Sequence, residues 1–170
     1  MMHLEELNDY KNRLMMDLCS DPDVVRIITG NDKASVPNHE LPYTQIFPYE
    51  YVPETVDEGK TFICFDVDIT SVPNKTIYLP AVYIWIFTHK SRMRIETEQG
   101  GRILVDELAA VIDRKLNGSR YYGLGTLELD SAPHFKPVTD YLGRALIYAA
   151  KDFNRPKGRV NAPSDRKPDR

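Results

Sequence analysis

The sequence predicts an α+β protein, in which an antiparallel sheet of about four strands carries helices packed on one face. Apolar residues recur at helical spacing in residues 3–18 and again in residues 102–117. Residues 61–69 and 76–88 instead have the alternating, β-branched and aromatic composition of strands. Only turn residues separate these two strand segments, which is typical of an antiparallel hairpin.

The N-terminal segment predicts two consecutive helices. Residues 3–18 place leucines along one face and charged or amide side chains along the other. The tripeptide Ser20-Asp21-Pro22 has the composition of a helix start, with proline at an early helical position. Gly30 is a typical stop, so we expect a second, short helix over residues 22–29.

Residues 31–59 form a long segment rich in proline and aromatic residues. Four prolines in this segment exclude a helix and disfavour a central strand. Long loops of this kind are uncommon in compact domains and are often functional. The interleaved aromatic residues indicate anchoring, and they are Tyr43, Phe47, Tyr49 and Tyr51. Two interpretations stay open: an arm that binds a partner, or a belt packed on the protein's own core.

The first strand segment predicts a sheet with two different faces. Phe62, Cys64 and the pair Asp66 and Asp68 share one face because side chains alternate along a strand. The intervening apolar residues fall on the other face, and they are Ile63, Phe65, Val67 and Ile69.

The second half of the chain predicts a helix followed by another hairpin. Residues 91–101 are polar and end in two glycines, so we expect a mobile connection there. The helix over residues 102–117 ends at Asn117-Gly118. Apolar patterns over 127–135 and 141–153 indicate two further strands. We therefore expect one α+β domain over residues 1–154, including the extended loop 31–59.

The charge is unevenly distributed along the chain. Residues 155–170 contain six basic and two acidic residues, a formal +4, so residues 1–154 carry −7 of the total of −3. We expect this proline-containing tail to be flexible, because it has too little apolar surface to offset its ordering entropy. It is either an arm for an acidic partner or a solvated tail. The acidic body disfavours a nucleic-acid partner, and no apolar run approaches the roughly 20 residues of a membrane span.

The strongest chemical motif is a pair of aspartates at the end of the first strand segment. Asp66-x-Asp68-x-Thr70 after an apolar strand is similar to the first motif of haloacid-dehalogenase-type phosphatases, which use Mg²⁺. That motif leads into a parallel crossover, however, whereas here a turn leads straight into another strand. The chain has two cysteines and four scattered histidines, without metal-ligand spacing. We expect no catalytic, cofactor-binding or metal-binding residues, and no enzyme.

Several segments together resemble the tail-terminator and tail-completion proteins of long-tailed bacteriophages and prophages. The segments that carry the resemblance are Ile84–His89, Asp106–Asn117, Gly123–Leu129, Phe135–Pro137 and Tyr141–Tyr148. The resemblance covers about residues 60–154 and the first helix.

This resemblance implies a structural role. Proteins of that family are small α+β subunits that form rings, commonly hexameric, which end the tail tube and join it to the head connector. It implies a virion protein of the tail or neck, made in the host cytoplasm, without a cofactor. Its partners would be further copies of itself, the tail tube protein, and the head connector and neck proteins. Because residues 31–59 and the basic tail depart from the family pattern, a head-completion, neck or other adaptor protein stays an alternative. A phosphatase-like enzyme that uses Asp66 and Asp68 with Mg²⁺ is the other alternative.

Ring subunits need exposed anchors, and aromatic and arginine side chains are the usual ones. We therefore predict three sets of interface residues along the chain. They are Tyr43, Phe47, Tyr49 and Tyr51 in the first loop, Arg92 and Arg94 in the second, and Arg155, Lys157 and Arg159 in the tail.

Overall fold

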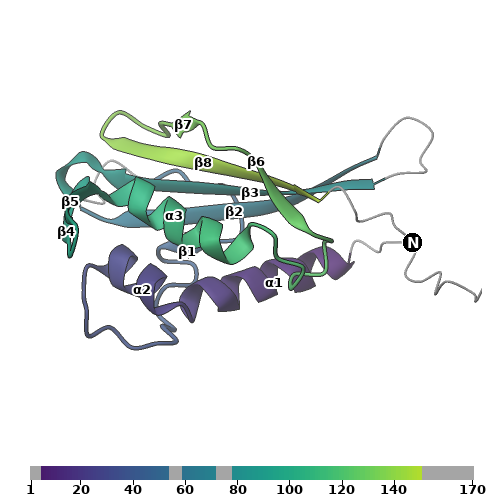
Figure 1. Cartoon of the computed structure of the whole chain (residues 1–170), viewed down its shortest axis with the longest axis horizontal. Coiled ribbons are helices and arrows are strands. Elements are labelled where there is room, and N and C mark those ends of the chain that lie inside the picture. Colours follow the sequence, from purple (N-terminus) through teal and green to yellow (C-terminus); the bar gives the residue numbers. More distant parts are fainter. Residues whose placement is uncertain (1–4, 54–58, 72–77, 151–170) are drawn as a thin grey trace, which may run out of the picture.

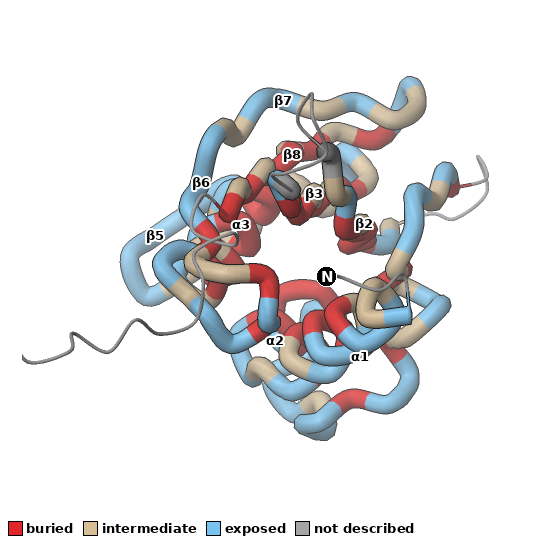
Figure 2. Tube along the Cα trace, turned by 90° about the vertical axis from the view of Figure 1, so that its right-hand side faces the viewer, coloured by how far each residue is buried: buried red, intermediate tan, exposed pale blue. Residues whose placement is uncertain are grey.

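A computed structural model describes residues 5–53, 59–71 and 78–150. In this part of the chain, the helices lie on one face of a twisted, mixed sheet (Figure 1). Viewed along the strands, the buried residues concentrate between the sheet and the helices (Figure 2). The predicted α+β class is confirmed.

The first two helices follow the predicted pattern. Helix α1 spans Glu5–Cys19, and α2 spans Pro22–Thr29. The Asp21 carboxylate caps α2 by accepting hydrogen bonds from the backbone amides of Asp23 and Val24. Gly30 ends α2 in the left-handed conformation, with φ of 68°. The short second helix therefore has the start and stop that its local sequence predicts.

The main sheet contains both predicted hairpins. Strand β2 (Thr61–Ser71) pairs antiparallel with β3 (Tyr78–His89), which pairs with β8 (Tyr141–Ala150). Strand β6 (Leu127–Ser131) and the short β7 (His134–Phe135) both pair with β8. A two-residue strand, β1 (Ile46–Phe47), adds a parallel edge beside β2. The described sheet thus exceeds the four expected strands, because the long loop contributes one and the last hairpin contributes β7.

The register of the sheet confirms the two predicted faces of β2. Ile63, Phe65 and Val67 face the helices and join the main core. Phe62 and Cys64 face the other way and join a second cluster, whose buried members also include Phe47, Phe87 and Tyr141. The sheet is therefore apolar on both faces along part of its length.

The connection over residues 91–101 differs from the prediction. A 3-10 turn (Lys90–Arg92) leads into a small hairpin, in which β4 (Arg94–Thr97) pairs with β5 (Gly100–Ile103). The Thr97 hydroxyl donates to the Gly100 carbonyl over 2.9 Å and closes the turn. Because Arg102 and Ile103 belong to β5, helix α3 begins at Leu104 and ends at Leu116. The expected connection therefore contains a strand pair, with its turn at residues 98–99 and both glycines in β5, and its mobility stays a prediction.

The C-terminal predictions fall partly beyond the described residues. Strand β8 is described as far as Ala150, so the end of the predicted strand at residue 153 lies outside the described residues. The tail 155–170, with Arg155, Lys157 and Arg159, also lies outside them. The domain boundary at residue 154 stays a prediction.

Candidate interaction surface

A tight turn presents an exposed tyrosine near the edge of the main sheet. The Leu41 carbonyl accepts backbone hydrogen bonds from residues 44, 45 and 46, and the Tyr43 amide donates to the Ile46 carbonyl over 2.8 Å. The Gln45 side chain fastens this turn to the carbonyl of Thr61, 2.9 Å away. Tyr43 at the tip has φ of 60°, an uncommon conformation for a bulky residue. Its side chain points outward and is 61% exposed.

The structure divides the four predicted aromatic anchors into two pairs. Phe47 stacks on Tyr51 with ring centroids 4.1 Å apart, and both rings contact Phe62 on the sheet. Tyr43 and Tyr49 instead remain outside, at 61% and 46% exposure, with their ring centroids 6.5 Å apart. Phe47 and Tyr51 therefore form the belt that the sequence offered as one interpretation. Tyr43 and Tyr49, the exposed tyrosine pair, keep the other interpretation open.

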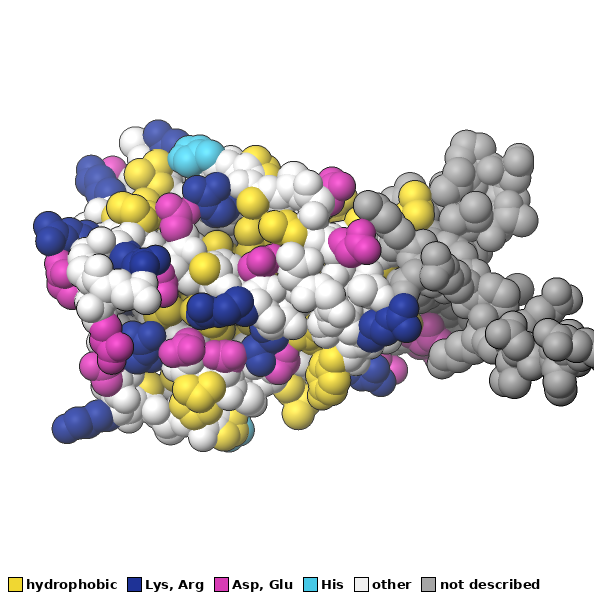
Figure 3. Space-filling view, viewed as in Figure 1, with side chains coloured by type: hydrophobic (Ala, Val, Ile, Leu, Met, Phe, Trp, Pro, Cys, Tyr) yellow, Lys and Arg dark blue, Asp and Glu magenta, His cyan; other side chains and the backbone are white. Residues whose placement is uncertain are grey.

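The two predicted arginines make contacts within the chain. The guanidinium of Arg92 donates to the Gly59 carbonyl over 2.9 Å, and partial burial lowers its pKa from the ordinary value. Arg94 pairs with Glu96 on its own hairpin, with Nη2 2.8 Å from Oε1, and both side chains are exposed. Arg92 is thus placed as a tether between loops. Arg94 remains at the surface, where basic and acidic side chains alternate around β4, β5 and α2 (Figure 3).

A surface that the sequence did not single out lies on the sheet face opposite the helices. The register places Ala81, Tyr83 and Trp85 of β3 beside Ile147 and Ala149 of β8. All five side chains are half-buried, and the rings of Tyr83 and Trp85 stack with centroids 6.0 Å apart. We name these residues the aromatic face. The alternation of side chains along residues 76–88 could have revealed part of this face. In the β2–β3 hairpin, Ala81 and Tyr83 lie opposite Asp68 and Asp66, respectively.

The two aspartates of the phosphatase-like motif lie on the edge of β2 and bond to its backbone. Asp66 Oδ1 accepts from the Val67 amide over 2.7 Å, and Asp68 Oδ1 accepts from the Ile69 amide over 2.8 Å. Asp66 also pairs with Lys11 of α1, 2.7 Å away. β2 then continues into the antiparallel β3 rather than a parallel crossover. This arrangement gives both carboxylates a structural role at the strand edge.

Cys64 and His89, which could act together only as neighbours, are separated along the sheet. Cys64 is buried opposite Trp85, and burial raises the pKa of its thiol to about 12. His89 lies four residues further along β3, roughly 13 Å away at strand spacing, and its ring bonds to Ser91 over 2.8 Å. A buried thiol held in its neutral form is a poor nucleophile.

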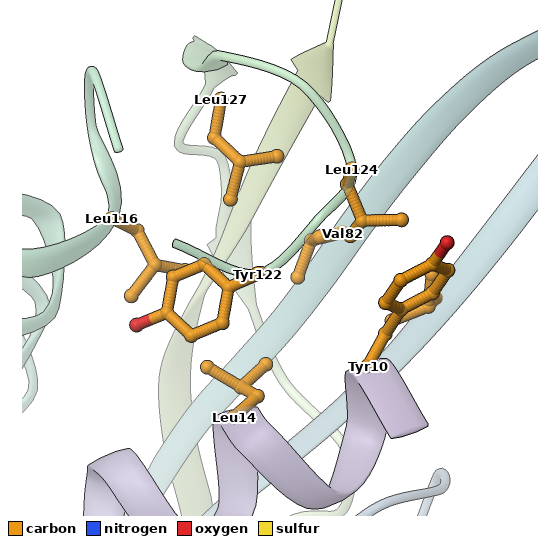
Figure 4. A pocket seen from close by; sticks show the side chains of 8 residues that line it. Tyr10, Leu14, Val82, Leu116, Tyr122, Leu124 and Leu127 are labelled. Carbon is orange, nitrogen blue, oxygen red and sulfur yellow. The ribbon is translucent and has the colours of Figure 1, made fainter. Parts of the chain in front are cut away.

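The cavities of the described residues offer little for a ligand. The void between α1, α3 and β6 is lined by apolar side chains that point at one another (Figure 4) and leave no space for water. An open cleft of about 670 Å³ lies between α2 and the small hairpin, and several of its acidic side chains pair with arginines. No group of three or more metal-ligating side chains occurs in the described ranges. None of their helices is long and apolar enough to cross a membrane.

The described features define a small α+β protein with a half-buried aromatic face on its sheet and an exposed tyrosine pair beside it. A family model, YomW, matches residues 21–150, and the chain belongs to the YomW family. YomW is a protein of a Bacillus prophage region, so membership of its family indicates a phage or prophage association. No curated protein and no solved structure matches the chain.

Proposed function

We propose that the protein is a structural component of a long-tailed phage particle. In this role it forms a ring at the tail–head junction, ends the tail tube and joins it to the head connector. Membership of a prophage-associated family supports a phage role. The resemblance to tail terminators over residues 60–154 supports the position in the particle.

The observation that carries the assembly role is the exposed tyrosine pair. The Tyr43 ring, on a turn fastened by Gln45 and the Leu41 carbonyl, lies beside the Tyr49 ring, which follows β1 and also contacts Phe47. Rigid, exposed aromatic rings supply large contact area at low entropic cost and are frequent interface anchors. A closed ring requires such a patch to meet a different surface on the neighbouring subunit. The exposed tyrosine pair is suited to be one of the two surfaces in that contact.

Solution mass tests this proposal directly. We expect light scattering over a wide concentration range to detect a discrete hexameric species. The double variant Tyr43→Asn/Tyr49→Ala should shift the mass towards the monomer, because it removes both rings. Asparagine tolerates the left-handed conformation at position 43, so the turn is retained. Tyr121→Ala is the matched control, since Tyr121 is 69% exposed on a different loop.

Binding to phage parts separates the terminator from its alternatives. Purified protein mixed with tail tubes of the encoding phage should bind at one tube end and stop further lengthening. Binding to the head connector alone would reassign the protein to the neck. A monomer at every concentration that binds neither part would overturn the proposal.

A further inference from the structure

Within the described residues, the aromatic face is covered at one end only. The second hydrophobic cluster, which contains Phe47, Phe87 and Tyr141, covers the sheet up to Trp85, which is only partly buried against it. Beyond Trp85 the side chains of Ala81, Tyr83, Ile147 and Ala149 belong to neither hydrophobic cluster of the described residues. Adjoining half-buried apolar side chains of this kind leave part of their surface accessible, and such surface often marks a site of contact.

Acidic residues border this uncovered half. Asp66 and Asp68 of β2 lie opposite Tyr83 and Ala81, respectively. Asp66 pairs with Lys11 and its side chain is still 44% exposed, and Asp68 is exposed as well. On the other side, Glu128 of β6 lies opposite Ala149. A segment with basic and apolar side chains therefore fits this border. The same face of a second copy fits it less well, because that face carries the same acidic border.

The chain supplies such a segment at the right place. Strand β8 is described as far as Ala150, which is adjacent to the uncovered half. The twenty residues that follow carry seven basic and three acidic side chains, a formal +4, together with Phe153. We propose that residues 151–170 fold back over the aromatic face of their own sheet, with their basic side chains beside Asp66 and Asp68.

The dimensions allow this contact within one chain. Trp85 lies four residues along β3 from Ala81, roughly 13 Å at strand spacing. Twenty residues span up to roughly 66 Å when extended, so the segment reaches the whole aromatic face. A segment attached beside its site also has an effective concentration in the millimolar range. It therefore outcompetes the tail of a second copy in dilute solution. This fold-back does not depend on ring formation.

Trp85 provides the measurement, because it is the single tryptophan of the protein. In the full chain we expect blue-shifted emission and weak quenching by acrylamide. The full-length triple variant Arg155→Gln/Lys157→Gln/Arg159→Gln should weaken fold-back by about tenfold, because it removes three of the seven basic charges of the segment. Its Trp85 emission should move to longer wavelength, with stronger quenching. Added salt should cause the same change in the unmodified protein.

A matched control separates local contact from net charge. Arg13→Gln/Lys33→Gln/Arg114→Gln removes the same charge from exposed positions on or beside the helices and should leave Trp85 emission unchanged. Far-ultraviolet circular dichroism verifies that each variant folds. Identical emission from the tail variant and the unmodified protein would overturn the proposal. Trp85 emission that changes on dilution together with the oligomeric mass would also overturn the proposal. In that case a second copy of the protein would cover the aromatic face.

Discussion

The Tyr148 hydroxyl of β8 donates a hydrogen bond to the Asp113 carboxylate of α3, with the two oxygens 3.0 Å apart. Tyr148 is completely buried, and Asp113 lies at the boundary with solvent. Burial raises the pKa of Tyr148 far above its ordinary value, and the neighbouring carboxylate raises it further. The bond therefore joins the last helix to the last described strand in the centre of the fold.

Removal of this hydroxyl should destabilise the protein without changing its shape. We expect Tyr148→Phe to lower the free energy of unfolding by about 1.5–3 kcal/mol, because a hydrogen bond to a charged acceptor is lost. Urea denaturation measures the change. Tyr121→Phe is the control and should have no effect, since that ring is exposed. Equal stability of Tyr148→Phe and the unmodified protein would show that the bond contributes nothing.

Gly143 permits the close contact between β3 and β8. A side-chain Cβ at this position would overlap the Ile86 carbonyl oxygen and lie 2.7 Å from Phe87 Cβ. Because the obstacle is backbone of the neighbouring strand, Gly143→Ala should cost about 3 kcal/mol or more. Gly101→Ala is the matched control, since its new methyl would meet only the flexible Arg94 side chain. Thermal melting compares the two variants, and equal melting temperatures would contradict the prediction.

The aspartates of β2 should protect its edge. Odd-numbered amides of this strand point away from β3: the Ile63 amide donates to Gln45, and those of Val67 and Ile69 donate to Asp66 and Asp68. Asp66→Ala/Asp68→Ala would expose two of these donors and promote strand-to-strand aggregation.

The matching amide variant isolates this effect. Asp66→Asn/Asp68→Asn retains the acceptor oxygens but loses the Lys11 ion pair, as the alanine variant does. We expect turbidity on warming to rise for the alanine variant and to stay near the original level for the asparagine variant. Equal turbidity for both would assign the effect to charge rather than to the backbone contacts.

Alkaline pH should destabilise the fold through its two buried thiols. Burial raises the pKa of Cys19 to about 11 and that of Cys64 to about 12. Because the folded pKa lies above the unfolded value near 8.5, the neutral thiol contributes stability fully below about pH 8.5 and progressively less above it. Between pH 8.5 and 10 the free energy of unfolding should fall, by up to ~1.4 kcal/mol per pH unit for each thiol.

Urea denaturation across this pH range tests the thiol contribution. Cys19→Ala/Cys64→Ala should have lower stability at neutral pH, because packing is lost, and a flatter pH dependence. An unchanged slope in the double variant would assign the alkaline loss to other groups.

Local patterns predicted the elements whose signals are short-range. The alternation in residues 61–69 gave the correct faces of β2, since strand geometry alone determines which side chains share a face. Asp21, Pro22 and Gly30 predicted α2, because capping residues act within one turn of the helix. The hairpin β4–β5 was not predicted because it is short, polar and exposed, so it has no apolar alternation.

The candidate surfaces depended on contacts between distant segments. The sequence proposed four aromatic anchors in one loop, and packing against Phe62 then placed Phe47 and Tyr51 inward and left Tyr43 and Tyr49 outside. The aromatic face was missed because Tyr83 and Trp85 read as ordinary strand residues until the register placed them beside β8. The arginine and tail residues stay predictions as interface positions.

The sequence by itself determined the α+β class, the short second helix, the two hairpins and the two faces of β2, because these follow from periodicity and local capping. Only the tertiary structure decided that the long loop supplies an edge strand, that Asp66 and Asp68 bond to the backbone, and that the second hydrophobic cluster of the described residues covers only part of one sheet face. Those features depend on which strands become neighbours. The burial of apolar surface between segments that are far apart in the chain determines which strands become neighbours.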